Sequence, residues 1–235
     1  MLTPNERVIM ISGANRGIGQ AIARTLGNAG FRLSLGARDP TSIDTGGFGR
    51  EVMTAKWDAL DVESSNAWVM ATAKHFGQID GVVLNAGVAI QVSLERDDDT
   101  PYETMWQTNF MGPLRLMRAA MPHLRASGHG RVVNIVSLTG KRVMSGSLLG
   151  YAASKFAASA LTHAIRQDGW DDNVRATSVC PGLVDTRMVA DFAVPAREFK
   201  IDPETVAETV AYALSLPNKA VVAEILLNSR LEPSL

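Results

Sequence analysis

The stretch RVIMISGANRGIG, residues 7–19, joins a short apolar run to a glycine-rich loop and decides how the chain folds. The run 7–12 is rich in Val, Ile and Met, which is typical of a buried parallel strand. A helical pattern follows the loop over about 17–29. Glycines at 13, 17 and 19 allow a sharp turn and a close approach to the backbone, and a helix N-terminus favours an anion. The stretch predicts a strand, a phosphate-binding turn and a helix, although a plain tight turn is the alternative.

The same alternation continues along the whole chain. Further strands are expected at 31–37, 52–57, 81–86, 131–137, 174–180 and 221–227. Helices are expected at about 64–76, 101–126, 151–168 and 203–216. Alternating strands and helices predict an α/β fold of the Rossmann type, a doubly wound parallel sheet of about seven strands in a single domain, residues 1–235. Ligands of such sheets bind beyond the carboxyl ends of the strands, so the segments there are the candidates for a site.

Composition excludes several classes of protein. The formal net charge of −1 over 235 residues gives no basic field for nucleic acid. No apolar run reaches the length of about 18 residues that a membrane span needs. The single cysteine, Cys180, allows no internal disulfide, and the four histidines show no metal-binding spacing. We therefore expect a cytoplasmic protein with no metal and with neither a nucleic acid nor a membrane as partner.

One predicted helix carries an unusual polar pair. In GYAASKFAASALTHA, residues 150–164, Tyr151 and Lys155 stand four residues apart and share a helical face. A phenol is a weak acid with a pKa of about 10, and a nearby ammonium group favours the phenolate and lowers that pKa. The pair can supply the proton that reduction of a carbonyl needs. The alternative is a packed Tyr151 beside a solvated Lys155.

Four motifs in order, SGANRGIG, NAG at 85–87, a serine followed by YAASK, and PG at 181–182, resemble the short-chain dehydrogenase/reductase family over about residues 7–227. The resemblance implies hydride transfer between a nicotinamide cofactor and a carbonyl or alcohol substrate. It implies the catalytic residues Asn109, Ser137, Tyr151 and Lys155. It implies cofactor contacts from Gly13, Asn15, Arg16, Gly17, Ile18, Gly19, Arg38, Asp61, Val62, Asn85, Ala86, Gly87, Tyr151, Lys155, Pro181, Gly182, Val184 and Thr186.

The resemblance also assigns roles within that set. Ser137 would orient the carbonyl oxygen, although Thr139, Ser145 and Ser147 lie nearby in the sequence. Asn109 would loosen the helix 101–126 and anchor a water relay to Lys155; local pairing of its amide is the alternative. Asp61, assigned to the adenine, can equally cap the next helix.

The choice of cofactor depends on the end of the second strand, LSLGARDP. Asp39 is an acidic candidate for the ribose hydroxyl of NAD, but it precedes Pro40 and is better explained as a turn residue. Arg38 and Arg16 each offer a guanidinium group to a ribose 2′-phosphate. The sequence therefore predicts NADP(H) as cofactor, with solvated loop charges as the alternative.

Substrate, assembly and activity are predicted less directly. The expected partner is a small apolar carbonyl or alcohol compound in an open cleft lined by Leu138, Val143, Met144, Leu183 and Met188. The resemblance implies a homodimer or homotetramer through the helices 101–126 and 151–168. Apolar residues there include Met105, Phe110, Leu114, Met117, Ala158 and Leu161. A non-catalytic nucleotide-sensing regulator is the alternative function, and the intact catalytic set favours the enzyme. The tail LLNSRLEPSL departs from the VDGG of many members.

Overall fold

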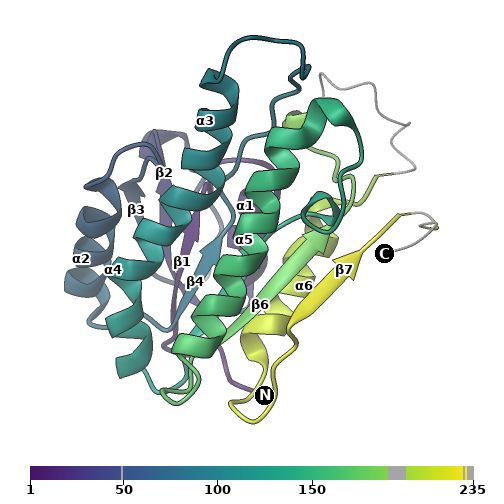
Figure 1. Cartoon of the computed structure of the whole chain (residues 1–235). Helices are drawn as coiled ribbons and strands as arrows, with labels where there is room; N and C mark the ends of the chain where they lie inside the picture. Colours follow the sequence, from purple (N-terminus) through teal and green to yellow (C-terminus); the bar gives the residue numbers. More distant parts are fainter. Residues whose placement is uncertain (49, 190–199, 230, 232–235) are drawn as a thin grey trace.

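The computed structural model describes residues 1–48, 50–189, 200–229 and 231. All seven expected strands are present and form one parallel sheet in the order β3-β2-β1-β4-β5-β6-β7 (Figure 1). The strands are β1 Val8–Ser12, β2 Arg32–Ala37, β3 Val52–Lys56, β4 Gly81–Leu84, β5 Arg131–Ile135, β6 Arg175–Pro181 and β7 Glu224–Leu227. The predicted Rossmann-type sheet is confirmed, and the largest difference is β7, which begins three residues later than expected.

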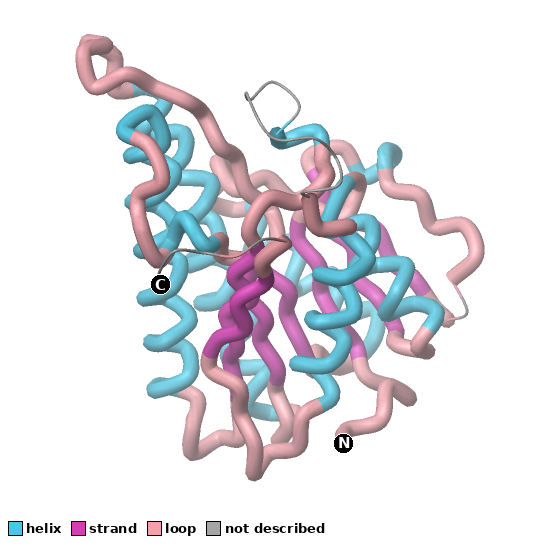
Figure 2. The backbone as a smooth tube through the Cα atoms, turned by 90° about the vertical axis from the view of Figure 1, so that its right-hand side faces the viewer, coloured by secondary structure: helices cyan, strands magenta, loops and turns pink. Residues whose placement is uncertain are grey.

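The helices form a layer on each face of the sheet because the central strands are apolar on both sides. In β1, Ile9 and Ile11 join one buried cluster while the intervening Met10 joins the other. Helices α1 Gly17–Asn28 and α6 Pro203–Ser215 pack on the first face. Helices α2 Ser64–Phe76, α4 Gly112–Ala126 and α5 Leu149–Asp168 pack on the second. Longer loops gather at the upper end of the strands in Figure 2, where the strands finish.

The helix expected over 101–126 is interrupted in its middle. Helix α3 Thr100–Trp106 runs into a π-helical turn, Gln107–Met111, and then into α4. Gly112 has no room for a side chain, because a Cβ there would lie 2.5 Å from the Cβ of Ala59. A widened turn places an extra residue in the helix and often occurs at functional sites. The π-helical turn contains Asn109, and the role of this residue in loosening the helix stays a prediction.

The residues named for a subunit contact are mostly internal. Met105, Met117, Ala158 and Leu161 are 0 to 6% exposed and belong to the core of this chain, which corrects their assignment to an interface. Phe110 and Leu114 are partly buried against the same core. The large apolar residues exposed on α3 and α5 are Trp106, Leu149 and Phe156. Assembly into a dimer or tetramer stays a prediction.

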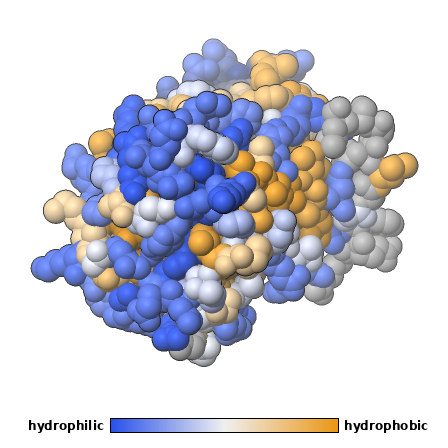
Figure 3. All heavy atoms as spheres, turned by 90° about the horizontal axis from the view of Figure 1, so that it is seen from below, coloured by the Kyte–Doolittle hydropathy of each residue, from blue (hydrophilic) through white to orange (hydrophobic). Residues whose placement is uncertain are grey.

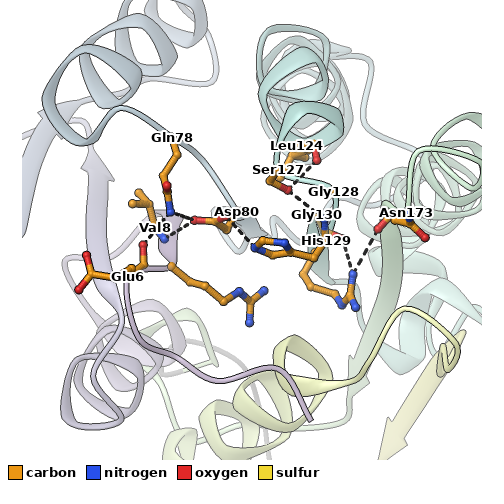
Figure 4. Close-up of polar contacts among 12 residues, drawn as sticks. Glu6, Val8, Gln78, Asp80, Leu124, Ser127, Gly128, His129, Gly130 and Asn173 are labelled. Atoms are coloured by element: carbon orange, nitrogen blue, oxygen red, sulfur yellow. Dashed lines mark hydrogen bonds and ion pairs between the residues drawn. The ribbon is translucent and has the colours of Figure 1, made fainter.

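Buried charged residues, Arg7 and Asp80, bind backbone groups at the lower end of the sheet. Asp80 precedes β4 and accepts hydrogen bonds from the backbone N–H of Val8 at 2.7 Å and from Gln78 at 2.8 Å, and it pairs with His129 at 3.0 Å (Figure 4). Arg7 donates to the Leu214 carbonyl at 2.9 Å. This arginine therefore satisfies an orphan carbonyl at the end of α6. The surface seen from below is largely hydrophilic, with a hydrophobic area to one side (Figure 3).

Candidate active site

A cleft of about 1260 Å³ lies at the carboxyl ends of the strands. It collects most of the residues that the sequence predicted there. Those lining it are Gly13, Asn15, Arg16, Gly17, Ile18, Gly19, Arg38, Asn85, Ala86, Gly87, Ser137, Tyr151, Lys155, Pro181, Gly182, Val184 and Thr186. The parallel sheet explains this, because the segments that follow parallel strands all leave the sheet at one edge.

The glycine loop is shaped so that a ligand can approach its backbone. Gly13 has a φ of +67°, which residues with a side chain rarely adopt. At Gly19 a Cβ would lie 2.1 Å from the carbonyl oxygen of Gly13, so no larger residue fits without moving the backbone. The loop leads directly into α1, whose N-terminal N–H groups have no intrahelical partner. Backbone donors and the helix dipole together suit a diphosphate.

Ser12 ties this loop to the turn after β4. Its hydroxyl accepts the backbone N–H groups of Asn85 at 3.0 Å and Ala86 at 3.1 Å. The amide of Asn85 donates back to the carbonyl groups of Ser12 at 2.9 Å and Gly13 at 3.1 Å. These hydrogen bonds therefore fix the glycine loop and the NAG turn, which both line the cleft, relative to each other.

Two exposed arginines stand at the far end of the cleft. Arg16 precedes α1 and Arg38 follows β2, and both line the cleft. Within the described part of the chain, neither guanidinium group has a hydrogen bond or an ion pair. Asp39 instead accepts hydrogen bonds from the backbone N–H of Thr41 at 3.0 Å and from its hydroxyl at 2.6 Å. These bonds lower the pKa of Asp39, and they match its predicted place in a turn.

The adenine-side prediction for Asp61 and Val62 is corrected by the structure. Neither residue lines the cleft, and Asp61 accepts the backbone N–H of Glu63 at 3.0 Å in the turn before α2. The segment that lines the cleft after β3 is Trp57, Asp58, Ala59 and Leu60. The sequence could have indicated Asp58, because this residue directly follows the expected strand 52–57, whereas Asp61 lies three residues further along.

Tyr151, Lys155 and Ser137 meet at the middle of the cleft. The ammonium nitrogen of Lys155 lies 5.8 Å from the centre of the Tyr151 ring and donates to the Ile135 carbonyl at 2.8 Å. Lys155 is 5% exposed, and burial lowers its pKa to about 8. The Ser137 hydroxyl, which follows β5, accepts the backbone N–H of Thr139 at 3.1 Å and is hydrogen-bonded to the Tyr151 phenol.

The expected lowering of the phenol pKa is not observed in this geometry. Burial raises the pKa of Tyr151 above its ordinary value, and the hydrogen bond with Ser137 lowers it by less than burial raises it. Desolvation penalises the charged phenolate, and the hydrogen bond with Ser137 compensates this penalty only in part. At neutral pH Tyr151 is therefore a protonated phenol beside a charged Lys155.

Asn109 lies behind the cleft rather than in its lining. Its side-chain oxygen accepts the backbone N–H of Val88 at 2.8 Å, and its amide nitrogen donates to the Val88 carbonyl and the Ser154 hydroxyl, both at 2.9 Å. A Cβ on Gly87 would lie 3.2 Å from the Asn109 oxygen and 3.5 Å from the Lys155 nitrogen. Asn109 thus positions the segment that passes Lys155. Its predicted water relay stays a prediction.

The remaining part of the cleft is more polar than the sequence suggested. Leu138, Met144, Leu183 and Met188 line it as predicted, but Val143 does not and is 50% exposed. Polar residues that sequence reasoning did not name also line this region: Gln91, Ser145, Asn228 and Ser229. They come from the loops after β4, β5 and β7. The unusual tail sequence indicated only that the segment after β7 differs from the family. A hydrogen bond of 2.9 Å from the Val92 N–H to the Ser147 carbonyl joins two of these loops.

Two further classes of site receive no support from the described residues. Among residues 1–48, 50–189, 200–229 and 231, no group of three or more His, Cys, Asp or Glu is placed to hold a metal ion. In the same part of the chain, no helix is long and apolar enough to cross a membrane.

Known proteins that are similar to this chain are oxidoreductases. A sequence profile of the family described as short chain dehydrogenase matches residues 7–195. An agropine synthesis reductase of Rhizobium rhizogenes is 41% identical over 219 residues, which are 92% of this chain and 50% of the relative. An uncharacterized oxidoreductase of Staphylococcus saprophyticus is 32% identical over 96% of this chain and 98% of the relative. The chain thus spans about half the length of the agropine synthesis reductase.

Solved structures share the fold closely. An alcohol dehydrogenase from the archaeon Thermococcus sibiricus, complexed with 5-hydroxy-NADP, has a TM-score of 0.89 at 31% identity, covering 97% of this chain and 99% of that chain. A metagenomic short-chain oxidoreductase in complex with NADP has a TM-score of 0.83 at 27% identity, covering 98% of this chain and all of that chain, 100%.

Proposed function

This chain belongs to the short-chain dehydrogenase family, and on that premise we propose that it transfers a hydride between NADP(H) and a carbonyl or alcohol substrate. The observation that carries the proposal is the meeting of Ser137, Tyr151 and Lys155 inside the cleft that the glycine loop opens. Three segments that are distant in the sequence converge there. A structural role for the phenol and ammonium group would not need a cleft beside them.

The shape and charge of the cleft fit a dinucleotide phosphate. The closely packed Gly13 and Gly19 leave backbone room for a diphosphate, and Arg16 and Arg38 offer two guanidinium groups that have no partner among the residues that the structure describes. A 2′-phosphate beside them would satisfy both charges. Two structural relatives are complexed with NADP or an NADP derivative, which supports the same choice. When bound, NADPH supplies the hydride that the carbonyl carbon receives.

Three residues of the chain would orient the carbonyl oxygen of the substrate and give it a proton. Ser137 would donate a hydrogen bond to the carbonyl oxygen and hold it toward the phenol. Tyr151 is protonated at neutral pH because burial raises its pKa, so it can give its proton to that oxygen. Lys155, with a pKa of about 8, is charged at pH 7 and would stabilise the phenolate that this transfer leaves. In the alcohol direction the same proton returns to Tyr151.

The proposal is tested by the loss of NADPH absorbance with a panel of ketones, aldehydes and quinones. We expect turnover by the parent with at least one class, and binding of NADPH without turnover by Tyr151→Phe. Tight NADPH binding with no turnover of any compound in either direction would contradict the proposal and favour a nucleotide-sensing protein.

A further inference from the structure

Asn228 is the first residue after β7, and the structure brings its side chain against Gly182 in the lining of the cleft. The backbone N–H of Gly182 donates to the Leu227 carbonyl at 2.8 Å and so fixes this point of the tail. A Cβ on Gly182 would lie 3.0 Å from the side-chain oxygen of Asn228 and 3.2 Å from the Leu138 side chain. Leu138 directly follows Ser137. The Asn228 amide therefore lies against Gly182, in the same cleft that Ser137 and Tyr151 line.

The amide of Asn228 differs from the other asparagine amides of the cleft in having no partner among the described residues. Asn15 donates to the Ser42 hydroxyl at 3.1 Å, and Asn85 is bound to the glycine loop. Across the described residues, the exposed Asn228 side chain makes no hydrogen bond. Its donor and acceptor groups both remain available to a ligand in the cleft. An amide in this state suits a partner that also offers both a donor and an acceptor.

We propose that Asn228 is a specificity-determining residue that hydrogen-bonds a neutral amide or hydroxyl group on the carbon chain next to the reacting carbonyl. Leu138 and Leu183, both in the cleft lining, contact the carbon atoms between the two groups. The inference rests on the proposed function and narrows its substrate class from carbonyl compounds in general to those that carry a neutral polar group; it replaces the apolar substrate that the sequence predicted. A site that hydrogen-bonds a substrate group discriminates strongly against an analogue that lacks it.

Three ketones of nearly equal shape test the proposal. 4-Oxopentanamide carries the neutral amide, 5-methylhexan-2-one replaces the amide by an apolar group, and 4-oxopentanoate replaces it by an anion. The ratio of kcat/KM for the amide to that for the apolar ketone should be at least about tenfold in the parent. Asn228→Leu should bring this ratio close to one, mainly by raising KM for the amide. A higher kcat/KM of the parent protein for the apolar ketone or for the anion than for the amide would overturn the proposal.

Gln91 supplies the matched control. It is a second amide in the cleft lining without a hydrogen bond among the described residues, but it lies on the loop after β4 rather than beside Gly182. Gln91→Leu should leave the amide preference as in the parent. An equal loss of preference in both variants would mean that general polarity of the cleft, and not Asn228, sets the specificity, and the proposal would fail. NADPH affinity and thermal unfolding of Asn228→Leu should match the parent, which shows that the variant is folded.

A binding measurement separates this inference from the proposed function. Calorimetry of 4-oxopentanamide against the protein loaded with NADP⁺ should show binding that Asn228→Leu weakens by about tenfold. Binding of this kind without turnover of any ketone would contradict the enzymatic proposal alone. Turnover of the three ketones with the same ratio in parent and Asn228→Leu would contradict the role of Asn228 alone.

Discussion

The Lys155 ammonium nitrogen lies 5.8 Å from the centre of the Tyr151 ring, one turn further along α5, and is anchored by the Ile135 carbonyl. The helix fixes the spacing of the two residues, and the sheet fixes the direction of the lysine. Burial raises the pKa of Tyr151 and lowers that of Lys155 to about 8, and both groups are still protonated at pH 7. The predictions below start from this arrangement.

Tyr151→Phe should lower kcat by about 10²–10⁴-fold while NADPH binding stays close to that of the parent. Only the transferable proton is removed, and the ring still fills its place. Lys155→Ala should reduce both turnover and cofactor affinity, because the ammonium group lies in the cofactor cleft. Steady-state kinetics and fluorescence titration measure the two effects. A Tyr151→Phe variant that turns over at nearly the parental rate would show that another group supplies the proton.

Lys155→Met should stabilise the fold at pH 7, because it removes a buried positive charge. The pKa of Lys155 is about 8 in the folded protein against an ordinary 10.5, so between these values the unfolded chain binds more protons. The stability of the parent therefore rises with pH over this range, and the charge costs most below pH 8. The variant should gain up to roughly 3 kcal/mol, less the lost hydrogen bond to Ile135. Urea unfolding from pH 7 to 10 should show that the difference in free energy of unfolding between Lys155→Met and the parent becomes smaller as the pH rises. A difference that stays constant over this range would contradict the prediction.

Arg38→Asp should abolish a preference for NADPH. The parent is expected to bind NADPH at least tenfold more tightly than NADH, a difference of about 1.4 kcal/mol. Arg118→Asp changes the charge equally on the exposed surface of α4, outside the cleft, and should keep that preference. Competitive titration with both nucleotides measures the ratio. Equal affinity of the parent for NADPH and NADH, or a preference for NADH, would overturn the cofactor assignment.

Gly19→Ala should weaken NADPH binding and destabilise the protein, because the new Cβ would lie 2.1 Å from the Gly13 carbonyl and the loop must move. We expect a loss of about 1–3 kcal/mol in the free energy of unfolding, as for other overpacked sites. Gly146→Ala is the control, since no atom of the described residues lies within 4 Å of its added Cβ and its φ is not positive. Thermal unfolding that affects both variants equally would refute the close-approach explanation.

Asp80→Ala should destabilise the fold by about 3 kcal/mol, because a buried carboxylate with several donors is removed. Its loss removes the acceptor of the Val8 N–H and the opposite charge that Asp80 offers to the buried Arg7. Asp168→Ala removes an exposed carboxylate that pairs with Arg125, and should cost less than about 1 kcal/mol. Urea unfolding compares the two. A cost for Asp80→Ala no larger than that for Asp168→Ala would show that the buried network adds little.

The sequence by itself determined the sheet and much of the cleft. Apolar runs separated by helical patterns predicted all seven strands. The five inner strands are buried and mostly apolar, whereas the edge strands β3 and β7 are only partly buried. The glycine loop, the NAG turn, Ser137 and the Tyr151–Lys155 spacing follow strand ends or one helical face. Local order along the chain is enough to place such residues at one edge of a parallel sheet.

Only the tertiary structure decided features that depend on contacts between distant segments. It placed Asp58 rather than Asp61 in the cleft, because the turn after β3 carries Asp61 away from it. It brought Asn228 against Gly182, which no spacing in the sequence could indicate, since β6 and β7 are joined through α6. It also reversed the expected pKa shift of Tyr151. Burial is a property of the packed molecule, and in this site it outweighs the hydrogen bond that Ser137 provides.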